Sequence, residues 1–368
     1  MKKVERKILL NPGPATTTDS VKWAMVTEDI CPREKEFGKL LDSIKEDLVK
    51  VVYGEDEYTA ALFTASGTGG LEAAITSAVP LGKKLLVIDN GAYGARMSNI
   101  ARTFGIEVVE YKIKVGDYPI VKDVENLFLQ HKDISHLAIV HHETTTGMLN
   151  PVQELCDLAH RFGAEVIVDC MSSYAGIPIN ITQWNAEYLV SSSNKCIQGM
   201  AGMVFVIFKK ELLEKIKNNK RSYYFNLYNQ HVGFEKTGQM QFTPPVQVAY
   251  ALRQAINEYF METEQGRWKR YSENWEALYL GLKTLGFEFL LPMEQQSKIL
   301  LAILEPKHRD YNFNAMHDFL YAKGFTIYPG KGAQEETFRL SILGDLHLAD
   351  INNFLEELKG YLASIKML

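Results

Sequence analysis

The sequence of 368 residues lacks any apolar run of the roughly 20 residues that a membrane-spanning helix needs. Its basic start is followed only by Ile8, Leu9 and Leu10, which is too short for the apolar region of a signal peptide. An excess of basic residues is also missing, because 40 Lys and Arg oppose 45 Asp and Glu. The formal net charge of -5 argues against binding to nucleic acids or anionic membranes. We therefore expect a cytoplasmic protein that binds neither.

Cysteine is also scarce. The sequence has four cysteines, far apart and without a CxxC pair: Cys31, Cys156, Cys170 and Cys196. This pattern favours isolated, reduced thiols and lacks a zinc spacing. His141, His142 and Glu143 are adjacent, but neighbouring side chains on a strand point to opposite faces, so we expect no metal site there. A Walker A motif and a complete GxGxxG motif are missing too, and with them the specific signatures of a nucleotide site.

Apolar and charged residues, by contrast, are present in amounts ordinary for a globular protein, at 46% and 23%. The chain is too long for one small core. We therefore expect a large domain at 15–265 and a smaller domain at 266–368, with residues 1–14 packing near the smaller one.

Short apolar runs alternate with helix-like segments between about residues 60 and 210. Several runs are continuous in Val, Ile and Leu, which is typical of strands buried on both faces. We expect strands at Ala61–Ser66, Leu85–Asn90, Glu107–Ile113, Leu137–Glu143, Glu165–Cys170, Glu187–Ser193 and Met203–Lys209. Helices are expected between most of them, at Gly70–Ser77, Met97–Phe104, Val121–Gln130 and Gln153–Phe162. This order predicts an α/β fold with a mostly parallel seven-stranded sheet, and a ligand site at the carboxyl ends of its strands.

The flanking segments predict further elements. Apolar residues at helical spacing between residues 40 and 52 predict an amphipathic helix that stops at Gly54. After the sheet we expect two long helices, Val246–Phe260 and Trp268–Leu285. A second α+β unit follows, with strands at Lys298–Leu304, Phe325–Tyr328 and Thr337–Ser341 and helices at Asn314–Lys323 and Ala349–Lys366.

Lys195 and Asp169 are the most informative pair of residues. Lys195 follows the small residues Ser191–Ser193 after a predicted strand, where its amine suits a Schiff base. Asp169 ends an apolar run, where a buried carboxylate suits the nitrogen of a pyridinium ring. Each residue alone has an ordinary alternative, a solvated lysine or a capping aspartate. Together they predict a site for pyridoxal phosphate (PLP).

A glycine-rich segment, residues 64–70, lies between a predicted strand and a predicted helix. The N–H groups at a helix N-terminus, and the close approach that glycine permits, make Ser66, Gly67 and Thr68 candidates for holding a phosphate. A plain turn is an equally good interpretation of this segment alone. Tyr93 follows the next predicted strand and is a candidate for stacking on a heteroaromatic ring, although a loop tyrosine would look the same.

Hydroxyl groups and guanidinium groups add further candidates. Thr144 or Thr145 is placed to reach a ring oxygen or a phosphate, unless this run caps the next helix. Thr243 precedes two prolines, where it either offers a hydroxyl or forms part of a turn. Arg339 lies on a predicted strand and is either an edge charge or a fork for an anionic substrate. Arg33 is a weaker candidate of the same kind, with acidic neighbours that it would otherwise pair with.

These residues form motifs that resemble the class V (fold-type I) PLP-dependent aminotransferases. The motifs are Asn11-Pro12-Gly13-Pro14, Ser66-Gly67-Thr68, Asp169 with Met171-Ser172-Ser173, and Asn194-Lys195-Cys196-Ile197-Gln198-Gly199. Within that class the chain most resembles the group that transfers the amino group of 2-aminoethylphosphonate to pyruvate. The points of resemblance to this group are residues 29–37 and 194–199. The resemblance extends over nearly the whole chain, from Asn11 to Arg339.

The resemblance implies a role for each candidate residue. Lys195 would form the Schiff base with PLP, and Asp169 would pair with its pyridine nitrogen, so that these two are the catalytic residues. Ser66, Gly67 and Thr68 would hold the cofactor phosphate.

The remaining candidates would complete the site. Tyr93 would stack on the cofactor ring, where some members of the family carry Trp, and Thr145 would also contact the cofactor. Thr243 would reach the cofactor from the second subunit of a homodimer with shared active sites. Arg339 would bind the anion of the substrate, and Arg33 is a hypothetical second donor to it.

The implied reaction converts 2-aminoethylphosphonate and pyruvate into phosphonoacetaldehyde and L-alanine. The alternative is another class V aminotransferase that uses alanine or serine with glyoxylate or pyruvate. A lyase such as a cysteine desulfurase would need a catalytic cysteine late in the chain, but the last one is Cys196, beside Lys195. A catalytically silent protein with this fold, or a nucleotide-binding protein, would bind no coloured cofactor.

Overall fold

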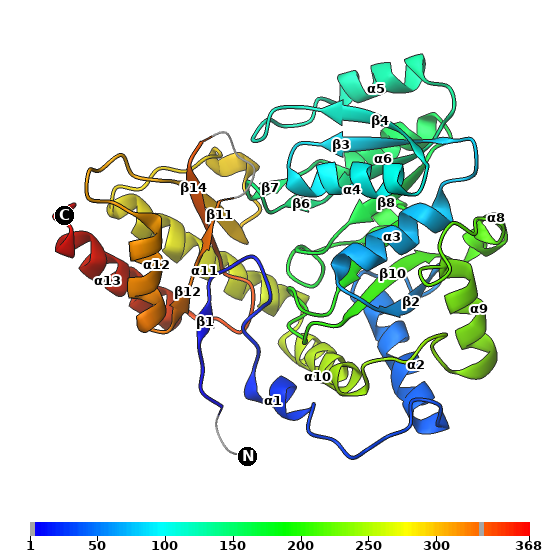
Figure 1. Cartoon of the computed structure of the whole chain (residues 1–368), viewed down its shortest axis with the longest axis horizontal. Coiled ribbons are helices and arrows are strands. Elements are labelled where there is room, and N and C mark those ends of the chain that lie inside the picture. Colours follow the sequence, from blue (N-terminus) through cyan, green and yellow to red (C-terminus); the bar gives the residue numbers. More distant parts are fainter. Residues whose placement is uncertain (1–3, 331–334) are drawn as a thin grey trace.

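The structure of the chain is a computed structural model that describes residues 4–330 and 335–368. Within these ranges, every helix is too short or too polar to span a bilayer. Figure 1 shows a large sheet with helices on both faces beside a smaller unit of helices and strands.

Seven strands form the large sheet: β2 (Tyr58–Thr64), β3 (Lys84–Asp89), β4 (Glu107–Lys112), β5 (Ile134–Val140), β8 (Glu165–Asp169), β9 (Tyr188–Ser192) and β10 (Met203–Lys209). Their order across the sheet is β2-β10-β9-β8-β5-β3-β4. β10 pairs antiparallel with both of its neighbours, and the other pairs are parallel. The predicted α/β fold with a mostly parallel seven-stranded sheet is therefore confirmed.

The two faces of the sheet pack into different cores, because successive side chains of a strand point to opposite faces. In β3, Leu85 and Val87 belong to one core, and Leu86 and Ile88 belong to the other. The first core also includes residues of α3 (Gly67–Ala78), α4 (Ala92–Thr103), α8 (Leu213–Ile216) and α9 (Leu227–Thr237). The second core includes residues of α2 (Lys35–Lys50), α5 (Val121–Gln130), α6 (Val152–Arg161), α7 (Ile181–Trp184) and α10 (Val246–Glu262).

The smaller unit has a core of its own. It contains α11 (Glu264–Thr284), α12 (Phe313–Ala322) and α13 (Leu348–Ser364), with the strands β11 (Leu300–Leu304), β12 (Phe325–Thr326), β13 (Tyr328–Pro329) and β14 (Thr337–Ser341). β11, β14 and β13 form an antiparallel sheet. Tyr271, Trp275 and Phe338 are buried in the core of this unit. The domain boundary at residue 265 stays a prediction.

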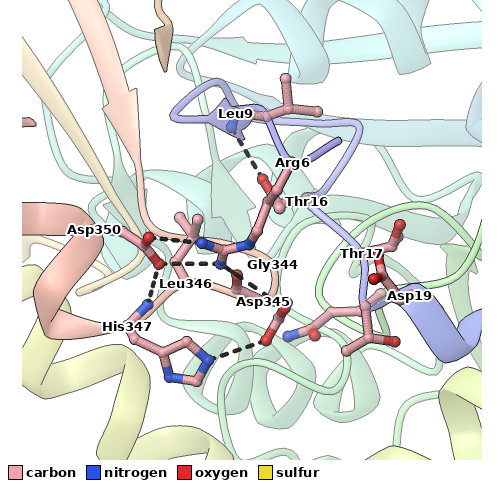
Figure 2. Close-up of polar contacts among 12 residues, drawn as sticks. Arg6, Leu9, Thr16, Thr17, Asp19, Gly344, Asp345, Leu346, His347 and Asp350 are labelled. Atoms are coloured by element: carbon pink, nitrogen blue, oxygen red, sulfur yellow. Dashed lines mark hydrogen bonds and ion pairs between the residues drawn. The ribbon is translucent and has the colours of Figure 1, made fainter. Parts of the chain in front are cut away.

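The N-terminal segment lies against the smaller unit. β1 (Ile8–Leu9) pairs parallel with β12, and Ile8 and Leu10 join the core of that unit. Figure 2 shows the polar contacts that hold this segment. Arg6 forms an ion pair with Asp350 at 2.6 Å. Residues 1–3 of the predicted N-terminal contact lie outside the described residues.

Several boundaries differ from the predicted ones. The predicted strand Leu137–Glu143 is two strands, because β5 ends at Val140 and β6 (His142–Glu143) pairs with β7 (Met148–Leu149) in a hairpin. The predicted strand at Phe325–Tyr328 likewise divides into β12 and β13. The short helix α1 (Asp19–Trp23) and α9 were not predicted, because their apolar spacing is weak. α4 begins five residues before the predicted helix start at Met97, so Tyr93 lies in its first turn.

Candidate active site

A cavity of about 450 Å³ lies at the carboxyl edge of the large sheet. It is formed by the ends of β5, β8 and β9 and by the first turns of α3 and α4. The residues that line it are Ser66, Gly67, Thr68, Leu71, Tyr93, Arg96, Val140, His142, Thr144, Asp169, Met171, Ser172, Ser192, Asn194, Lys195, Ala201 and Gly202. Six of the predicted site residues therefore share one cavity: Ser66, Gly67, Thr68, Tyr93, Asp169 and Lys195.

Lys195 is held by a tight turn after β9. Its carbonyl accepts a hydrogen bond from the Gln198 N–H at 2.8 Å, and Gln198 takes the left-handed conformation with φ of 67°. The Nζ atom of Lys195 donates a hydrogen bond to the carbonyl of Pro12 in the N-terminal segment. Desolvation by the surrounding protein lowers the pKa of Lys195, which favours the neutral, nucleophilic amine.

Asp169 is the last residue of β8 and is 2% exposed. Its Oδ1 atom accepts a hydrogen bond from the Met171 N–H at 2.9 Å. Burial is the largest influence on this carboxyl, and it raises the pKa to about 6. A cation placed against Asp169 would reverse this shift, so the carboxylate is suited to a positively charged ring nitrogen.

The N-terminus of α3 opens into the cavity. Ser66 is the N-cap residue, and its side chain forms no capping hydrogen bond. The first N–H groups of a helix have no partner within the helix, so this end is suited to an anion. A Cβ atom on Gly67 would lie 2.7 Å from the sulfur of Met171, which shows how closely the opposite wall approaches. The start of α3 thus offers N–H donors and a close backbone approach, which suit the binding of a phosphate.

Glu143 fixes the first turn of α4. Its side chain is fully buried, and Oε2 accepts hydrogen bonds from the N–H groups of Tyr93 at 3.2 Å and Gly94 at 3.3 Å. A carboxylate is stabilised at a helix N-terminus by these donors and by the helix dipole. This contact fixes the helical turn from which Tyr93 lines the cavity.

Arg96 and His142 line the cavity but were missed by the sequence analysis. Arg96 lies one helical turn after Tyr93, and this spacing was hidden because the helix was predicted to begin at Met97. The Nδ1 atom of His142 lies 3.2 Å from the Ser172 carbonyl, and burial lowers its pKa to about 4. His142 is therefore a neutral, rigidly held wall residue. The described residues contain no group of three or more potential metal ligands.

Thr144, and not Thr145, lines the cavity. Thr145 is fully buried behind the wall, where its hydroxyl accepts a hydrogen bond from the Ala92 N–H at 3.0 Å. The structure thus places Thr144 and not Thr145 on the cavity wall, because the hairpin of β6 and β7 turns Thr145 toward the first turn of α4. A contact of either residue with the cofactor stays a prediction.

Arg339 lies next to the cavity on β14. It is 5% exposed, and its guanidinium donates hydrogen bonds to the carbonyls of Pro329 at 3.1 Å and Thr144 at 3.2 Å. Its side chain also forms a hydrogen bond with Tyr93. These contacts hold a guanidinium of the smaller unit against the wall of the larger one.

Arg33 and Thr243 do not line this cavity. The Arg33 guanidinium donates hydrogen bonds to the Gln239 side chain at 3.2 Å and the Met240 carbonyl at 2.8 Å. Thr243 follows in the same segment and is exposed. Neither side chain therefore lines the cavity of its own protomer, although the Thr243 carbonyl accepts a hydrogen bond from the Thr64 hydroxyl at the end of β2.

Comparisons with known proteins identify the family. The family model of class V aminotransferases matches residues 22–346. The chain is 40% identical over 353 residues to the 2-aminoethylphosphonate–pyruvate transaminase of Vibrio vulnificus, and this match covers 95% of each chain. It is also 40% identical over 354 residues to the enzyme of that name from Bacillus cereus, covering 95% of this chain and 96% of the relative.

A solved structure supports the same assignment. The alanine–glyoxylate aminotransferase of Nostoc sp. superimposes with a TM-score of 0.88 and 25% identity, over 98% of this chain and 96% of that one. The resemblance to PLP-dependent aminotransferases that the motifs predicted is therefore confirmed. The chain belongs to the class V aminotransferases, and it is a transaminase whose cofactor is pyridoxal phosphate.

Proposed function

We propose that the enzyme transfers the amino group of 2-aminoethylphosphonate to pyruvate and forms phosphonoacetaldehyde and L-alanine. The observation that carries this proposal is the position of Lys195, Asp169 and the N-terminus of α3 around one cavity, with Arg339 beside it. The names of the relatives near 40% identity supply the choice of donor and acceptor.

The cavity fits PLP. Burial raises the pKa of the Asp169 carboxyl to about 6, as expected of a buried carboxyl in the absence of a cationic partner. The glycine-rich start of α3 offers donors to a phosphate, and the lowered pKa of Lys195 suits an amine that attacks an aldehyde. When bound, PLP supplies an electron sink for the bond that breaks at the substrate carbon.

The chain's own residues then divide the work. Lys195 would hold the cofactor, and its amine, once freed by the amine of the substrate, would move a proton as a general base and then as an acid. Asp169 stays ionised against the ring nitrogen. Ser66, Gly67 and Thr68 hold the phosphate end.

Two wall residues orient the cofactor. Tyr93, which lines the cavity, would stack on the ring. The proposed contact of the hairpin residue with the ring is Thr144, because Thr144 lines the cavity.

The anion of the substrate is the proposed ligand of Arg339. Arg339 already touches Thr144 and Tyr93, so an anion bound there lies against the cofactor wall. A phosphonate has three oxygens and more charge than a carboxylate, and a second guanidinium would favour it. Arg33 is our proposal for that role, but its position outside its own cavity means that it would have to serve the site of a second subunit.

We further propose a homodimer. Thr243 is exposed and does not line its own cavity, as a residue that completes a neighbouring site should be. Arg33 contacts Met240, three residues before Thr243 in the chain. The same subunit contact would therefore deliver both side chains.

An absorption titration tests the function. 2-Aminoethylphosphonate is added to the purified enzyme without a keto acid, and the visible band of the bound cofactor should disappear and then return on addition of pyruvate. Bleaching by alanine or serine alone would instead favour an enzyme that uses these donors with glyoxylate.

The variant Arg33→Ala tests the second guanidinium. A higher concentration of 2-aminoethylphosphonate should be required to bleach the band of this variant, while the concentration of alanine required is unchanged. If the variant responded more weakly to 2-aminoethylphosphonate and to alanine by the same factor, Arg33 would not be a ligand of the phosphonate.

A further inference from the structure

The cavity has few permanent positive charges. Among the described residues that line it, the basic side chains are Arg96, His142 and Lys195. His142 is neutral at pH 7, because burial lowers its pKa to about 4. Lys195 would be bonded to the cofactor aldehyde, and desolvation disfavours its charged form. Arg96 is therefore the permanent cation on the described part of the cavity wall.

The guanidinium of Arg96 lies at the seat that we assign to the phosphate. Its Nη1 atom donates a hydrogen bond to the Thr68 hydroxyl at 3.4 Å, in the first turn of α3. Its central carbon lies 4.7 Å from the centroid of the Tyr93 ring. Its positive charge also acts on the Asp169 carboxyl, where it partly opposes the rise in pKa that burial causes. Arg96 thus stands between the phosphate seat and the residues that hold the ring.

We propose that Arg96 binds the phosphate of PLP. This assignment rests on the proposed cofactor site. A phosphate ester carries about -1.5 to -2 charges at pH 7, whereas a helix N-terminus supplies roughly half a positive charge. The start of α3 therefore cannot neutralise the group alone. A guanidinium has the planar fork of donors that matches two phosphate oxygens, and it remains charged at every relevant pH.

The competing explanation is that Arg96 supports only the Tyr93 ring through a cation–π contact. The two roles differ in what they require of the ligand. A phosphate contact strengthens the binding of PLP but not of pyridoxal, which has the same ring and aldehyde without the phosphate. Support of the Tyr93 ring strengthens the binding of both.

The experiment measures the dissociation constants of PLP and pyridoxal for the full chain freed of cofactor, by absorbance titration. Arg96→Gln should weaken PLP binding by on the order of 10- to 100-fold, as for the loss of a charge-assisted hydrogen bond. Pyridoxal binding should change less than about twofold. Arg96→Lys, which keeps the charge without the fork, should lie between wild type and Arg96→Gln. Arg102→Gln is the matched control, because Arg102 is on the same helix but pairs with Glu110 at 3.2 Å on the surface.

Four results would overturn the assignment. PLP and pyridoxal weakened equally by Arg96→Gln would show that Arg96 acts through Tyr93 or through the fold. Unchanged affinity for PLP would show that the phosphate does not use Arg96. If the wild-type protein bound PLP no better than pyridoxal, the cavity would have no binding site for the phosphate. If the wild-type protein bound neither compound, the proposed function would fail together with this inference.

Discussion

Asp169 illustrates the conflict between stability and function at the scale of one residue. Folding buries its carboxyl in a site where the Met171 N–H donates a hydrogen bond to it at 2.9 Å. Burial raises the pKa of this carboxyl from the ordinary aspartate value of 3.8 to about 6. Since the folded state binds the proton more tightly than the unfolded state, ionisation of this group destabilises the cofactor-free protein. The cost is absent below about pH 4, grows as the pH rises, and is complete above about pH 6.

The variant Asp169→Asn should therefore be more stable than wild type at pH 7 when both lack the cofactor. The ionised carboxylate costs up to roughly 3 kcal/mol there, and asparagine keeps the acceptor for the Met171 N–H without the charge. The gain should shrink as the pH falls from 6 to 4, and the variant should lose transaminase activity. Urea unfolding across this pH range measures the difference. A stability difference that did not depend on pH would contradict the assignment of the raised pKa.

At the scale of elements, the position of α3 depends on how closely it packs on the sheet. A Cβ atom on Gly70 would overlap Val204 of β10 and lie 2.8 Å from Val190 of β9. Glycine at this helical position therefore lets α3 approach the strands whose ends form the site. Its N-terminus is held at the cavity by this contact, so packing in the core positions the phosphate seat.

Gly70→Ala should destabilise the protein by about 1–3 kcal/mol, because the added methyl group overpacks the junction of helix and sheet. Gly233 on α9 provides the matched control, since a Cβ atom there meets no heavy atom within 4 Å. Gly233→Ala should stabilise the protein by about 0.5–1 kcal/mol through helix propensity alone. Urea unfolding measures both variants. The same sign in the two would mean that α3 has room to move away from the sheet.

At the scale of the whole molecule, the site joins units with separate cores. Lys195 and Asp169 follow strands of the large sheet, whereas Arg339 belongs to β14 of the smaller unit. The N-terminal segment touches both, because it pairs with β12 and its Pro12 carbonyl accepts the hydrogen bond of Lys195. The proposed dimer extends this pattern, with Thr243 of one subunit completing the cavity of the other.

Mixing two inactive variants tests the shared site. Lys195→Ala removes the amine that binds the cofactor. Thr243→Ala removes the hydroxyl that is proposed to reach the cofactor of the neighbouring subunit. A mixed dimer has one site with Lys195 from one subunit and Thr243 from the other, so up to half of the wild-type activity per dimer should return. Cofactor retention and activity of the mixture, compared with each variant alone, are the measurements. If Thr243 serves its own subunit, no complete site forms and the mixture stays as weak as its parents.

The sequence by itself determined the fold class and the chemistry, because both depend on local patterns. Continuous Val/Ile/Leu runs separated by helical segments predicted the strands, and the sheet contains all seven. The ends of parallel strands meet at one edge of a sheet, so Lys195 and Asp169 were expected together and do line one cavity. Their roles stay predictions until the variants are made, but the family and the cofactor that they indicated are confirmed.

Only the tertiary structure decided which neighbouring side chains face the cavity. Thr144 and Thr145 are adjacent in sequence, and the hairpin after β5 exposes the first to the cavity and buries the second behind it. Arg96 enters the site because α4 begins at Ala92, and Glu143, which holds that first turn, lies some 50 residues away in the chain. Arg33, expected as a second donor to the substrate, contacts Met240 and does not line the cavity of its own protomer. The physical reason is that side-chain direction is set by turns and packing between distant segments, which no local pattern of residues records.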